Sequence, residues 1–342
     1  MTSSSLVVLD ALPLPLTEGD RLRSYHLGRA IAAEGRCHLA VLQADREQLS
    51  ELQQTGPFDR ILALPARPPS PAYGRHLRLD NGGYLRHGWP RWWRETRQAL
   101  VEFINLTNAT TVIAGKLPVA ELVAGLPGAR RVVDDFDCYT LTLEREYALE
   151  RPVMTWPQRL THRLAQWRYR RQEAGLAHDF DLVTTISPAD GARLRELNPD
   201  APIEVVPNGV SDALLGDDAA PDAPTTRGVA FWGNLAFAPN RSAVQWFIEQ
   251  VYDPYLQAHD LPCYLIGGGA DDWIRALPSR YGAVRVLGFV EDLASVVKTV
   301  PIMINPMVSG SGLKNKMLEA MALRRAIVST PMGSEAIDAV AG

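Results

Sequence analysis

Lysine and cysteine are both scarce in this chain. Of the 35 basic residues only four are lysine, and the others are arginine. The three cysteines, Cys37, Cys138 and Cys263, stand far apart and lack the Cys/His spacing of a zinc site. This pattern argues against a structural zinc site and a disulfide framework, and it favours a reducing compartment.

Long apolar runs and a strong net charge are also missing. No run approaches the ~18 apolar residues of a membrane-spanning helix, and the N-terminus lacks the basic region of a signal peptide. The net charge of −4 gives no general attraction to nucleic acid, and no nucleic-acid-binding motif is present. We therefore expect a cytoplasmic protein without a nucleic-acid partner. A length of 342 residues with 46% hydrophobic residues allows two domains with large cores.

Short apolar runs alternate with longer amphipathic segments, which predicts an α/β fold. Strands are expected at 6–9, 38–42, 61–64, 112–114, 131–134, 182–186, 203–206, 228–233, 263–266, 284–287, 302–305 and 326–329. Helices are expected at 20–34, 93–106, 143–178, 188–197, 240–250, 292–299 and 313–323. The rhythm indicates two doubly wound, Rossmann-like domains that face a cleft.

A polar, Pro-rich segment interrupts this rhythm and predicts the domain boundary. We expect an N-terminal domain over 1–210, a linker over 211–226 and a C-terminal domain over 227–342. Only 13 residues follow Ser329, the last residue of the last expected strand. Because such a domain normally closes with further helices, we expect the second domain to be truncated at its C-terminus.

Two of the four lysines, Lys314 and Lys316, lie in one run after the strand 302–305. The run predicts a turn of small residues and then a helix that starts near Leu313. Lysine in a first helical turn is unfavourable, because the helix N-terminus already carries a partial positive charge. An anion in the turn, held also by the N–H groups of the Gly310-Ser311-Gly312 segment, would account for both lysines. A phosphate-bearing ligand is the natural candidate.

The predicted helix has a polar and an apolar face. Asn315, Lys316 and Glu319 fall within one arc of about 100°. The residues expected to pack on a sheet are Leu313, Met317, Ala320 and Met321. An ammonium for a diphosphate and a carboxylate for vicinal hydroxyls suit a nucleotide-sugar site. An exposed Lys–Glu pair would be the simpler alternative, but it leaves the glycine spacing unexplained.

Several segments together resemble the family-4-type retaining glycosyltransferases of GT-B fold. They are residues 19–26, 206–210, 231–234, 288–292 and, most strongly, 312–322 with Glu319 in place. The chain departs from the family at Ser311, where the first glutamate of a Glu-x7-Glu pair is usual, and it shares this with a subgroup that has a Gly-Ser-Gly turn. The usual cations after the first donor-domain strand are also missing from 234–240, and we expect Lys314 and Lys316 to replace them.

The resemblance implies a hexosyltransferase that moves a sugar from a nucleoside-diphosphate sugar to a cell-surface glycan or lipid-linked acceptor with retention. Lys316 and Glu319 are the expected catalytic residues of the donor domain. The expected donor-binding residues are Gly233, Asn234, Phe289, Val290, Gly310, Ser311, Gly312, Leu313, Lys314 and Asn315. No Asp-x-Asp metal motif occurs in the second domain, so we expect no metal and no cofactor, with cations and helix-end amides stabilising the leaving diphosphate.

The acceptor side is expected in the first domain. Gly19, Asp20 and Arg23 open its first long helix, and Arg23 could equally be an exposed helical arginine. Asp134 and Asp137 follow a strand, where a carboxylate could take the proton of an acceptor hydroxyl; N-capping of the next helix is the alternative. His26 is a further catalytic candidate, with a plain helix-face histidine as its alternative.

Two regions mix arginine with aromatic residues: 73–97, with Trp89, Trp92 and Trp93, and 159–171, with Trp167 and Tyr169. Such mixtures suit an anionic membrane interface or a lipid-diphosphate acceptor. Packed helices with solvated arginines are the alternative. We therefore expect that the protein can make peripheral contact with the inner face of the cell membrane.

Two other functions are compatible with the same motifs. A sugar-nucleotide epimerase would have a similar two-domain shape and would need acid–base carboxylates, which the cluster at Asp134 could supply. A catalytically silent GT-B protein that serves as a scaffold would fit Ser311 and the short second domain. Glu319 and the two lysines favour an active transferase.

Overall fold

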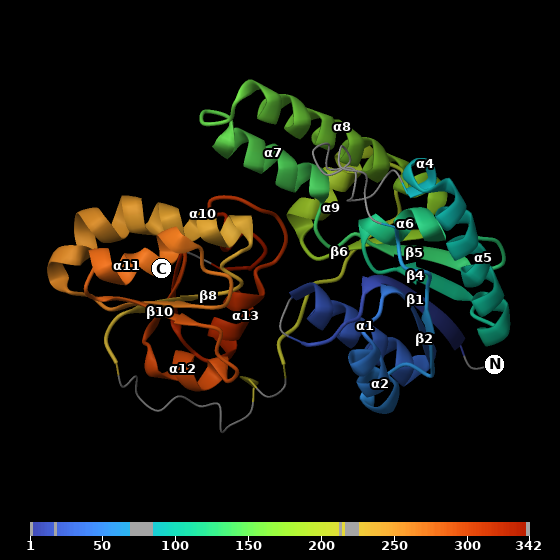
Figure 1. The fold of residues 1–342 in the computed structure, drawn as a ribbon, viewed down its shortest axis with the longest axis horizontal. Helices are drawn as coiled ribbons and strands as arrows, with labels where there is room; N and C mark the ends of the chain where they lie inside the picture. Colours follow the sequence, from blue (N-terminus) through green and yellow to red (C-terminus); the bar gives the residue numbers. More distant parts are fainter. Residues whose placement is uncertain (1–2, 17–18, 69–84, 212–213, 216–225, 340–342) are drawn as a thin grey trace. The chain divides into compact units, whose positions relative to one another are not determined.

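The computed structural model describes residues 3–16, 19–68, 85–211, 214–215 and 226–339. Most of the predicted linker and residues 73–84 of the first arginine-rich region lie outside these ranges. The chain divides into two compact units, Met1–Pro207 and Asn208–Gly342. Each unit is a parallel sheet with helices on both faces, as Figure 1 shows. The predicted α/β fold with two Rossmann-like units is thus confirmed.

The first unit contains a seven-stranded sheet of order β3-β2-β1-β4-β5-β6-β7. Its strands are β1 (Ser3–Ala11), β2 (Gly35–Gln43), β3 (Arg60–Ala63), β4 (Thr111–Ala114), β5 (Arg130–Asp134), β6 (Leu182–Thr185) and β7 (Ile203–Val205). Every pairing is parallel, and the register places Leu6 beside His38 of β2 and Val112 of β4. Parallel strands need crossover connections, which the intervening helices supply.

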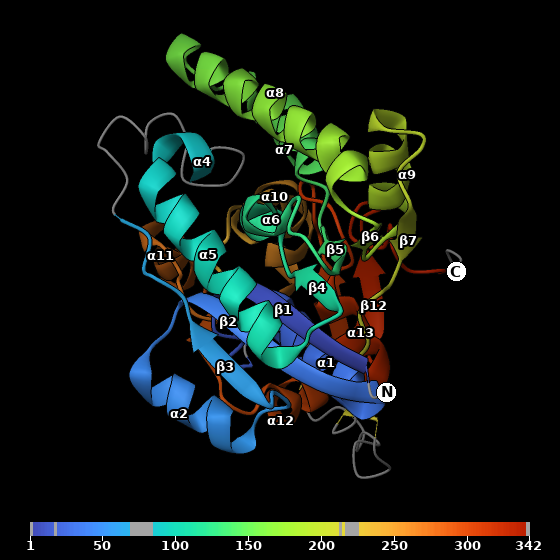
Figure 2. The same ribbon diagram turned by 90° about the vertical axis from the view of Figure 1, so that its right-hand side faces the viewer.

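Helices cover both faces of this sheet (Figure 2). They are α1 (Gly19–Glu34), α2 (Arg46–Thr55), α4 (Leu85–Gly88), α5 (Pro90–Thr107), α6 (Leu117–Val123), α7 (Tyr139–Glu150), α8 (Trp156–Asp179) and α9 (Pro188–Leu197). Leu6 and Val8 of β1 face the core under α5, α6 and α8. Val7 and Leu9 face the core under α1 and α2. The central strand is therefore buried on both sides, and it reads as an unbroken apolar run.

The single long helix predicted over 143–178 is wrong, because the structure contains a hairpin of α7 and α8. Tyr139 stacks on Tyr169 with ring centroids 4.8 Å apart, and Tyr147 lies 5.3 Å from the ring of His162. These pairs run in opposite directions along the two helices, so the helices are antiparallel. The break at 151–155 follows from Pro152 and Pro157, since proline removes a helical N–H and disfavours helix in the residue before it.

The second unit contains a five-stranded parallel sheet of order β10-β9-β8-β11-β12. Its strands are β8 (Val229–Trp232), β9 (Cys263–Ile266), β10 (Val284–Gly288), β11 (Ile302–Asn305) and β12 (Ala326–Ser329). Its α-helices among the described residues are α10 (Ala238–Phe247), α11 (Asp272–Arg280), α12 (Leu293–Thr299) and α13 (Asn315–Ala322). One core lies under α10 and α11 and another under α12 and α13.

The helix predicted over 240–250 is longer than expected and changes its character. After α10 the chain continues as a π-helix over Ile248–Leu256, with Pro254 inside it. Pro254 has no N–H to donate, which favours the wider turn. The helices α2 and α6 were not predicted. Helix α2 is short and polar and α6 is short and mostly buried, so neither shows a clear helical period.

Candidate functional site

The order of the second sheet places a topological switch point at the end of its central strand. Strand β8 pairs with β9 on one side and with β11 on the other, so the sheet grows from β8 first in one direction and then in the other. Ligands of doubly wound sheets bind at the carboxyl ends of the strands at such a switch point. Here the switch point is flanked by the loop 233–237 after β8 and the loop 306–314 after β11.

Gly233 follows β8 directly at this switch point and has no side chain. A Cβ atom at Gly233 would lie 3.2 Å from Lys316 Nζ and 2.9 Å from Asn240 Nδ2. Its φ of 148° is also one that other residues rarely adopt. Glycine at this position lets the ammonium of α13 approach the end of β8.

Lys316 extends from the first turn of α13 to that point. Its Nζ donates to Asn240 Oδ1 at 2.7 Å and lies 4.1 Å from the centre of the Phe231 ring. Asn240 is fixed in turn, since its Nδ2 donates to Asn234 O at 2.8 Å. Burial lowers the pKa of Lys316 to about 7, although Glu319 acts in the opposite direction. The amino group of Lys316 is therefore held in a partly dehydrated position beside the end of β8.

Glu319 lies one turn further along α13 and also contacts the end of β8. Its Oε2 accepts a hydrogen bond of 2.6 Å from Trp232 Nε1. Burial raises the pKa of the Glu319 carboxyl, and the bond from Trp232 and the charge of Lys316 oppose this. The structure thus brings the predicted ammonium and carboxylate together at one strand end.

The predicted division of α13 into faces is partly wrong. Met317 and Ala320 are buried as expected, but Met321 is 50% exposed. The helix starts at Asn315 rather than near Leu313, and its inner arc consists of Lys316, Met317, Ala320 and Leu323. A polar residue can occupy this arc because the aliphatic stem of Lys316 reaches past the core to the Phe231 ring. An exposed Lys–Glu surface pair does not describe these residues.

Lys314 is directed differently from Lys316. As the N-cap residue of α13, it donates through Nζ to the carbonyls of Ser311 at 2.9 Å and Gly312 at 2.7 Å. Gly310 and Gly312 have φ of 96° and 72°, which glycine adopts without strain. Lys314 therefore stabilises the turn, and its contact with a diphosphate stays a prediction. Asn315 is also engaged, since its Oδ1 accepts from Asn208 Nδ2 at 2.9 Å.

The remaining predicted donor residues lie on neighbouring loops. Phe289 follows β10 and is 63% exposed, whereas Val290 packs against the core under α12 and α13. Asn234 follows Gly233, is exposed, and accepts from Ala236 N at 3.0 Å. Leu313 is buried just before α13. Only Phe289 offers a free aromatic face for a nucleobase among these.

The first sheet has its own switch point between β1 and β4. Lys116 follows β4, and its Nζ lies 2.5 Å from Asp20 Oδ2 and 3.3 Å from Asp10 Oδ1. Burial alone would lower the pKa of Lys116, but these two carboxylates raise it. The sequence analysis named Asp20 but missed Asp10 and Lys116. The scarcity of lysine, which identified Lys314 and Lys316, would have identified Lys116 as well.

Arg23 and Asp134, predicted separately, form one buried ion pair. The Nε and Nη2 atoms of Arg23 donate to the two oxygens of Asp134, each at 2.7 Å. Thr184 Oγ1 also donates to Asp134 at 2.7 Å, and Arg23 Nη1 donates to Val206 O at 2.8 Å. Arg23 is therefore not the exposed helical arginine of the alternative. The base role of Asp134 stays a prediction, and both of its oxygens already accept hydrogen bonds from Arg23 or Thr184.

The other acceptor candidates are less enclosed. Gly19 begins α1, Asp137 is partly buried after β5, and His26 is exposed on α1 with Tyr25 edge-on at 5.7 Å. The capping alternative for the aspartates is wrong. Cys138 is the N-cap residue of α7, and Glu173 of α8 accepts the N–H group of Tyr139 at 2.6 Å.

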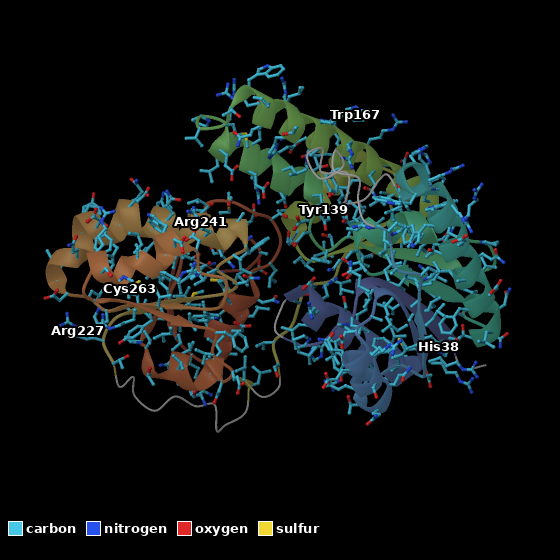
Figure 3. All side chains as sticks on the ribbon, in the orientation of Figure 1. His38, Tyr139, Trp167, Arg227, Arg241 and Cys263 are labelled. Carbon is cyan, nitrogen blue, oxygen red and sulfur yellow. The ribbon has the colours of Figure 1, made fainter. Side chains whose placement is uncertain are left out.

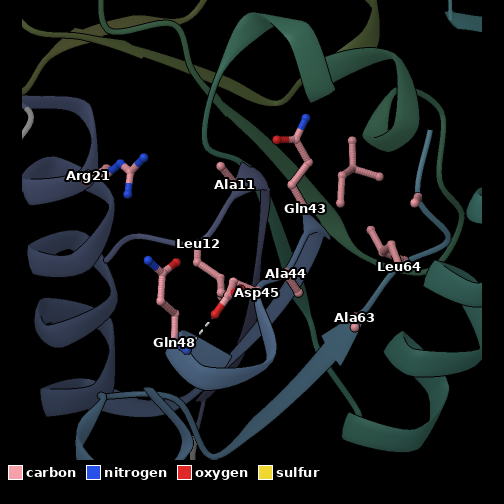
Figure 4. Close-up of a pocket in the computed structure, with 11 residues that line it drawn as sticks. Ala11, Leu12, Arg21, Gln43, Ala44, Asp45, Gln48, Ala63 and Leu64 are labelled. Atoms are coloured by element: carbon pink, nitrogen blue, oxygen red, sulfur yellow. Dashed lines mark hydrogen bonds between the residues drawn. The ribbon is translucent and has the colours of Figure 1, made fainter. Parts of the chain in front are cut away.

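A pocket of about 470 Å³ lies in the first unit at the carboxyl ends of β1, β2 and β3 (Figure 4). Its polar lining consists of Arg21, Gln43, Asp45 and Gln48. The Asp45 side chain accepts the backbone N–H groups of Glu47 and Gln48 and so caps α2. The side-chain amides of Gln43 and Gln48 line the pocket and can donate to and accept from a ligand. Such groups suit hydroxyl-rich molecules.

Neither a metal-binding cluster nor a membrane-spanning helix is found in the described part of the chain. No group of three or more His, Cys, Asp or Glu side chains there is arranged to hold a metal ion. No helix within the same ranges is long and apolar enough to cross a bilayer.

The second unit matches a known protein family in sequence, and the whole chain is similar to solved structures in fold. Residues 226–342 match the family model described as "Glycosyl transferases group 1". Alr3699/HepE of Anabaena, solved with UDP-glucose, is 14% identical with a TM-score of 0.62, over 97% of this chain and 81% of that one. A glycosyltransferase of Rickettsia africae is 10% identical with a TM-score of 0.61, over 99% and 83%. TarM of S. aureus is 10% identical with a TM-score of 0.64, over 96% and 85%.

No curated protein matches the chain. At these identities the structural likeness shows the fold, which is that of the GT-B glycosyltransferases. The fold and the family match of the second unit together support a glycosyltransferase.

Proposed function

We propose that the protein transfers a sugar from a nucleoside-diphosphate sugar to a cell-surface glycan or lipid-linked acceptor, with retention and without a metal ion. The observation that carries this proposal is the convergence of Lys316, Glu319 and Gly233 at the switch point of the second sheet. A nucleotide-sugar donor is also consistent with the HepE structures, which contain UDP or UDP-glucose.

In the proposed reaction, the bond between the anomeric carbon and the diphosphate breaks, and the carbon bonds to an acceptor hydroxyl that loses its proton. The leaving diphosphate gains negative charge. Lys316 lies at the end of β8, where Gly233 has no side chain, and the N-terminal end of α13 adds a partial positive charge. Both stabilise the charge that develops in the transition state.

Glu319 is proposed to accept hydrogen bonds from the ribose hydroxyls. The Trp232 Nε1 group occupies one of its oxygens, which fixes the carboxylate and leaves the other oxygen for the ligand. Phe289, exposed after β10, is the proposed platform for the nucleobase. The acceptor is proposed to bind the first unit near Asp10, Asp20 and Lys116.

The carrying observation is tested by replacing Lys316 with alanine. We expect kcat/KM for the nucleotide sugar to fall about 100-fold, with a raised donor KM and a lowered kcat, because one charge-stabilising group is removed. A thermal-shift screen of nucleoside diphosphates and nucleotide sugars first identifies the donor, since a ligand of the native state raises its stability. Turnover is then measured with that donor.

Lys298→Ala is the matched control, because Lys298 lies in the last turn of α12 in the same unit. We expect it to behave like the wild type. An unchanged kcat/KM in Lys316→Ala would remove the assignment of Lys316. Nucleotide binding without transfer to any acceptor would favour the scaffold, and formation of an epimer of the free donor would favour the epimerase.

A further inference from the structure

The tip of the α7–α8 hairpin exposes several large apolar side chains. Val153 is 85% exposed and Trp156 is 74% exposed, and Leu149, Leu160 and Trp167 are between 42% and 55% exposed. All five belong to two helices and the turn that joins them. Single exposed apolar residues need no explanation, but a cluster of this kind marks an interaction surface. We call these five residues the hairpin patch.

The patch continues along one side of α8. Trp156, Leu160 and Trp167 follow each other at intervals of four and seven residues, which places them on one helical face. The opposite face, with His162, Ala165 and Tyr169, is buried. Figure 3 labels Trp167 on this helix. The exposed stripe is therefore the face of α8 that does not pack in the first unit.

The charge around the patch is mainly positive, and Glu150, between Leu149 and Arg151, is the carboxylate nearest to it in the sequence. Between Arg151 and Gln172 the sequence contains six arginines and no aspartate or glutamate. Arg163, Arg170 and Arg171 are exposed beside the apolar stripe, and the Arg171 guanidinium lies 5.8 Å from the centre of the Trp167 ring. On α7, Glu144 pairs with Arg193 at 2.5 Å, and Glu146 lies 3.8 Å from His162. These two carboxylates are thus engaged away from the stripe.

The first arginine-rich region does not share this exposure. Trp92 of α5 is buried and donates to Pro65 O at 2.9 Å, and Trp93 donates to Glu121 O at 3.3 Å. Trp89 packs against the same core. For these tryptophans the packed-helix alternative is correct. Among the tryptophans that the structure describes, only Trp156 and Trp167 of the hairpin patch are more than half exposed.

Exposed tryptophan, aliphatic side chains and an excess of arginine over carboxylate are the chemistry of a helix at a membrane interface. Tryptophan prefers the head-group region of a bilayer, and arginine binds the phosphates of anionic lipids. A protein partner would need an acidic, apolar face of matching shape. A bilayer provides both properties over any area.

We propose that the hairpin patch docks on the surface of an anionic lipid bilayer. Trp156 and Leu160 insert at head-group depth, and Arg163, Arg170 and Arg171 contact lipid phosphates. This gives a location to the peripheral membrane contact that the arginine-rich, aromatic segments predict. Vesicle binding requires no turnover, so the two proposals can fail separately.

The test is co-sedimentation of the full chain with vesicles of phosphatidylcholine alone and of phosphatidylcholine with phosphatidylglycerol. We expect the wild type to bind the anionic vesicles about 10-fold or more tightly than the neutral ones, and less tightly at high salt. The double variants Trp156→Ala/Leu160→Ala and Arg163→Glu/Arg171→Glu should each lose most of this binding. Leu106→Ala and Arg94→Glu, which change exposed residues of α5, are the matched controls and should bind like the wild type.

Far-ultraviolet circular dichroism and thermal unfolding establish that each variant is folded. As a second measurement on the wild type, brominated lipids should quench tryptophan fluorescence in anionic vesicles. Equal binding to both vesicle types, no binding to either, or wild-type binding by the two hairpin variants would each overturn the proposal. A hairpin variant that loses self-association, measured by light scattering, while it keeps vesicle binding would assign the patch to a second copy of the chain instead.

Discussion

Lys316 is the residue on which the proposed donor site depends, and its pKa of about 7 places its titration in the working range of an enzyme. The site is formed so that burial favours the neutral amine while a diphosphate requires the ammonium. In the free protein at neutral pH, Lys316 is therefore a mixture of the charged and the neutral form. Binding of the diphosphate must be accompanied by uptake of a proton by Lys316.

This balance predicts how nucleotide affinity depends on pH. The affinity for the nucleoside diphosphate should be nearly constant below pH 7. Above pH 7 it should fall by up to about tenfold per pH unit, because the fraction of charged Lys316 falls. Isothermal titration calorimetry in buffers of different ionisation enthalpy should detect proton uptake at pH 8.

Lys316→Arg provides the control for this prediction, since arginine stays charged throughout the range. Its nucleotide affinity should change less with pH than that of the wild type. A wild-type affinity that stays constant between pH 6 and pH 9 would show that Lys316 does not titrate in this range or does not contact the diphosphate.

At the scale of elements, the loops that follow β8 and β9 are held together by a close backbone contact. Gly267 has a φ of 141°, and a Cβ atom there would lie 1.9 Å from Gly233 O. Gly233 N also donates to Ile266 O at 3.0 Å. The position of Gly233 beside Lys316 therefore depends on the absence of a side chain at Gly267.

Gly267→Ala should lower the free energy of unfolding by about 2–4 kcal/mol, because it adds both backbone strain and a clash with backbone atoms. Urea denaturation measures this loss. Gly282→Ala is the control, since a Cβ atom there would have no neighbour within 4 Å, and its effect should be small. Equal stability of the two variants would mean that the loops move apart at little cost.

The strands were easier to predict than the helices, and the reason is physical. Strands such as Cys263–Ile266 and Ile302–Asn305 were predicted with their observed bounds, because a central parallel strand is a short apolar run with polar ends. The hairpin of α7 and α8 was predicted as one helix. Each half is predicted as helix from its own residues, and the contacts of Tyr139 with Tyr169 and of Tyr147 with His162 show that the chain turns back.

At the scale of the whole molecule, the two units have the same plan with different chemistry at their switch points. The second unit has Lys316 and Glu319 at the end of β8. The first unit has Lys116 between Asp10 and Asp20, where β1 and β4 end. The proposed function implies a division of labour, with nucleotide binding in the second unit.

Hydrogen exchange measured by mass spectrometry should show this division. A bound nucleoside diphosphate should slow exchange most in peptides that cover 233–240 and 306–320, by about tenfold or more at a saturating concentration. Peptides from α11, which lies away from the switch point, serve as the internal control and should not change. Strongest protection in the first unit would contradict the assignment of the donor site.

The sequence by itself determined the α/β class, most strands and the grouping of Lys314, Lys316 and Glu319, because apolar runs and local helix chemistry are properties of neighbouring residues. The tertiary structure alone decided which groups meet. Phe231, Trp232 and Asn240 position Lys316 and Glu319, and Arg23 pairs with Asp134 across 111 positions. It also decided that tryptophan is exposed on α8 and packed on α5. Such pairings depend on the order of strands in a sheet and on the packing of helices against it, which no local pattern encodes.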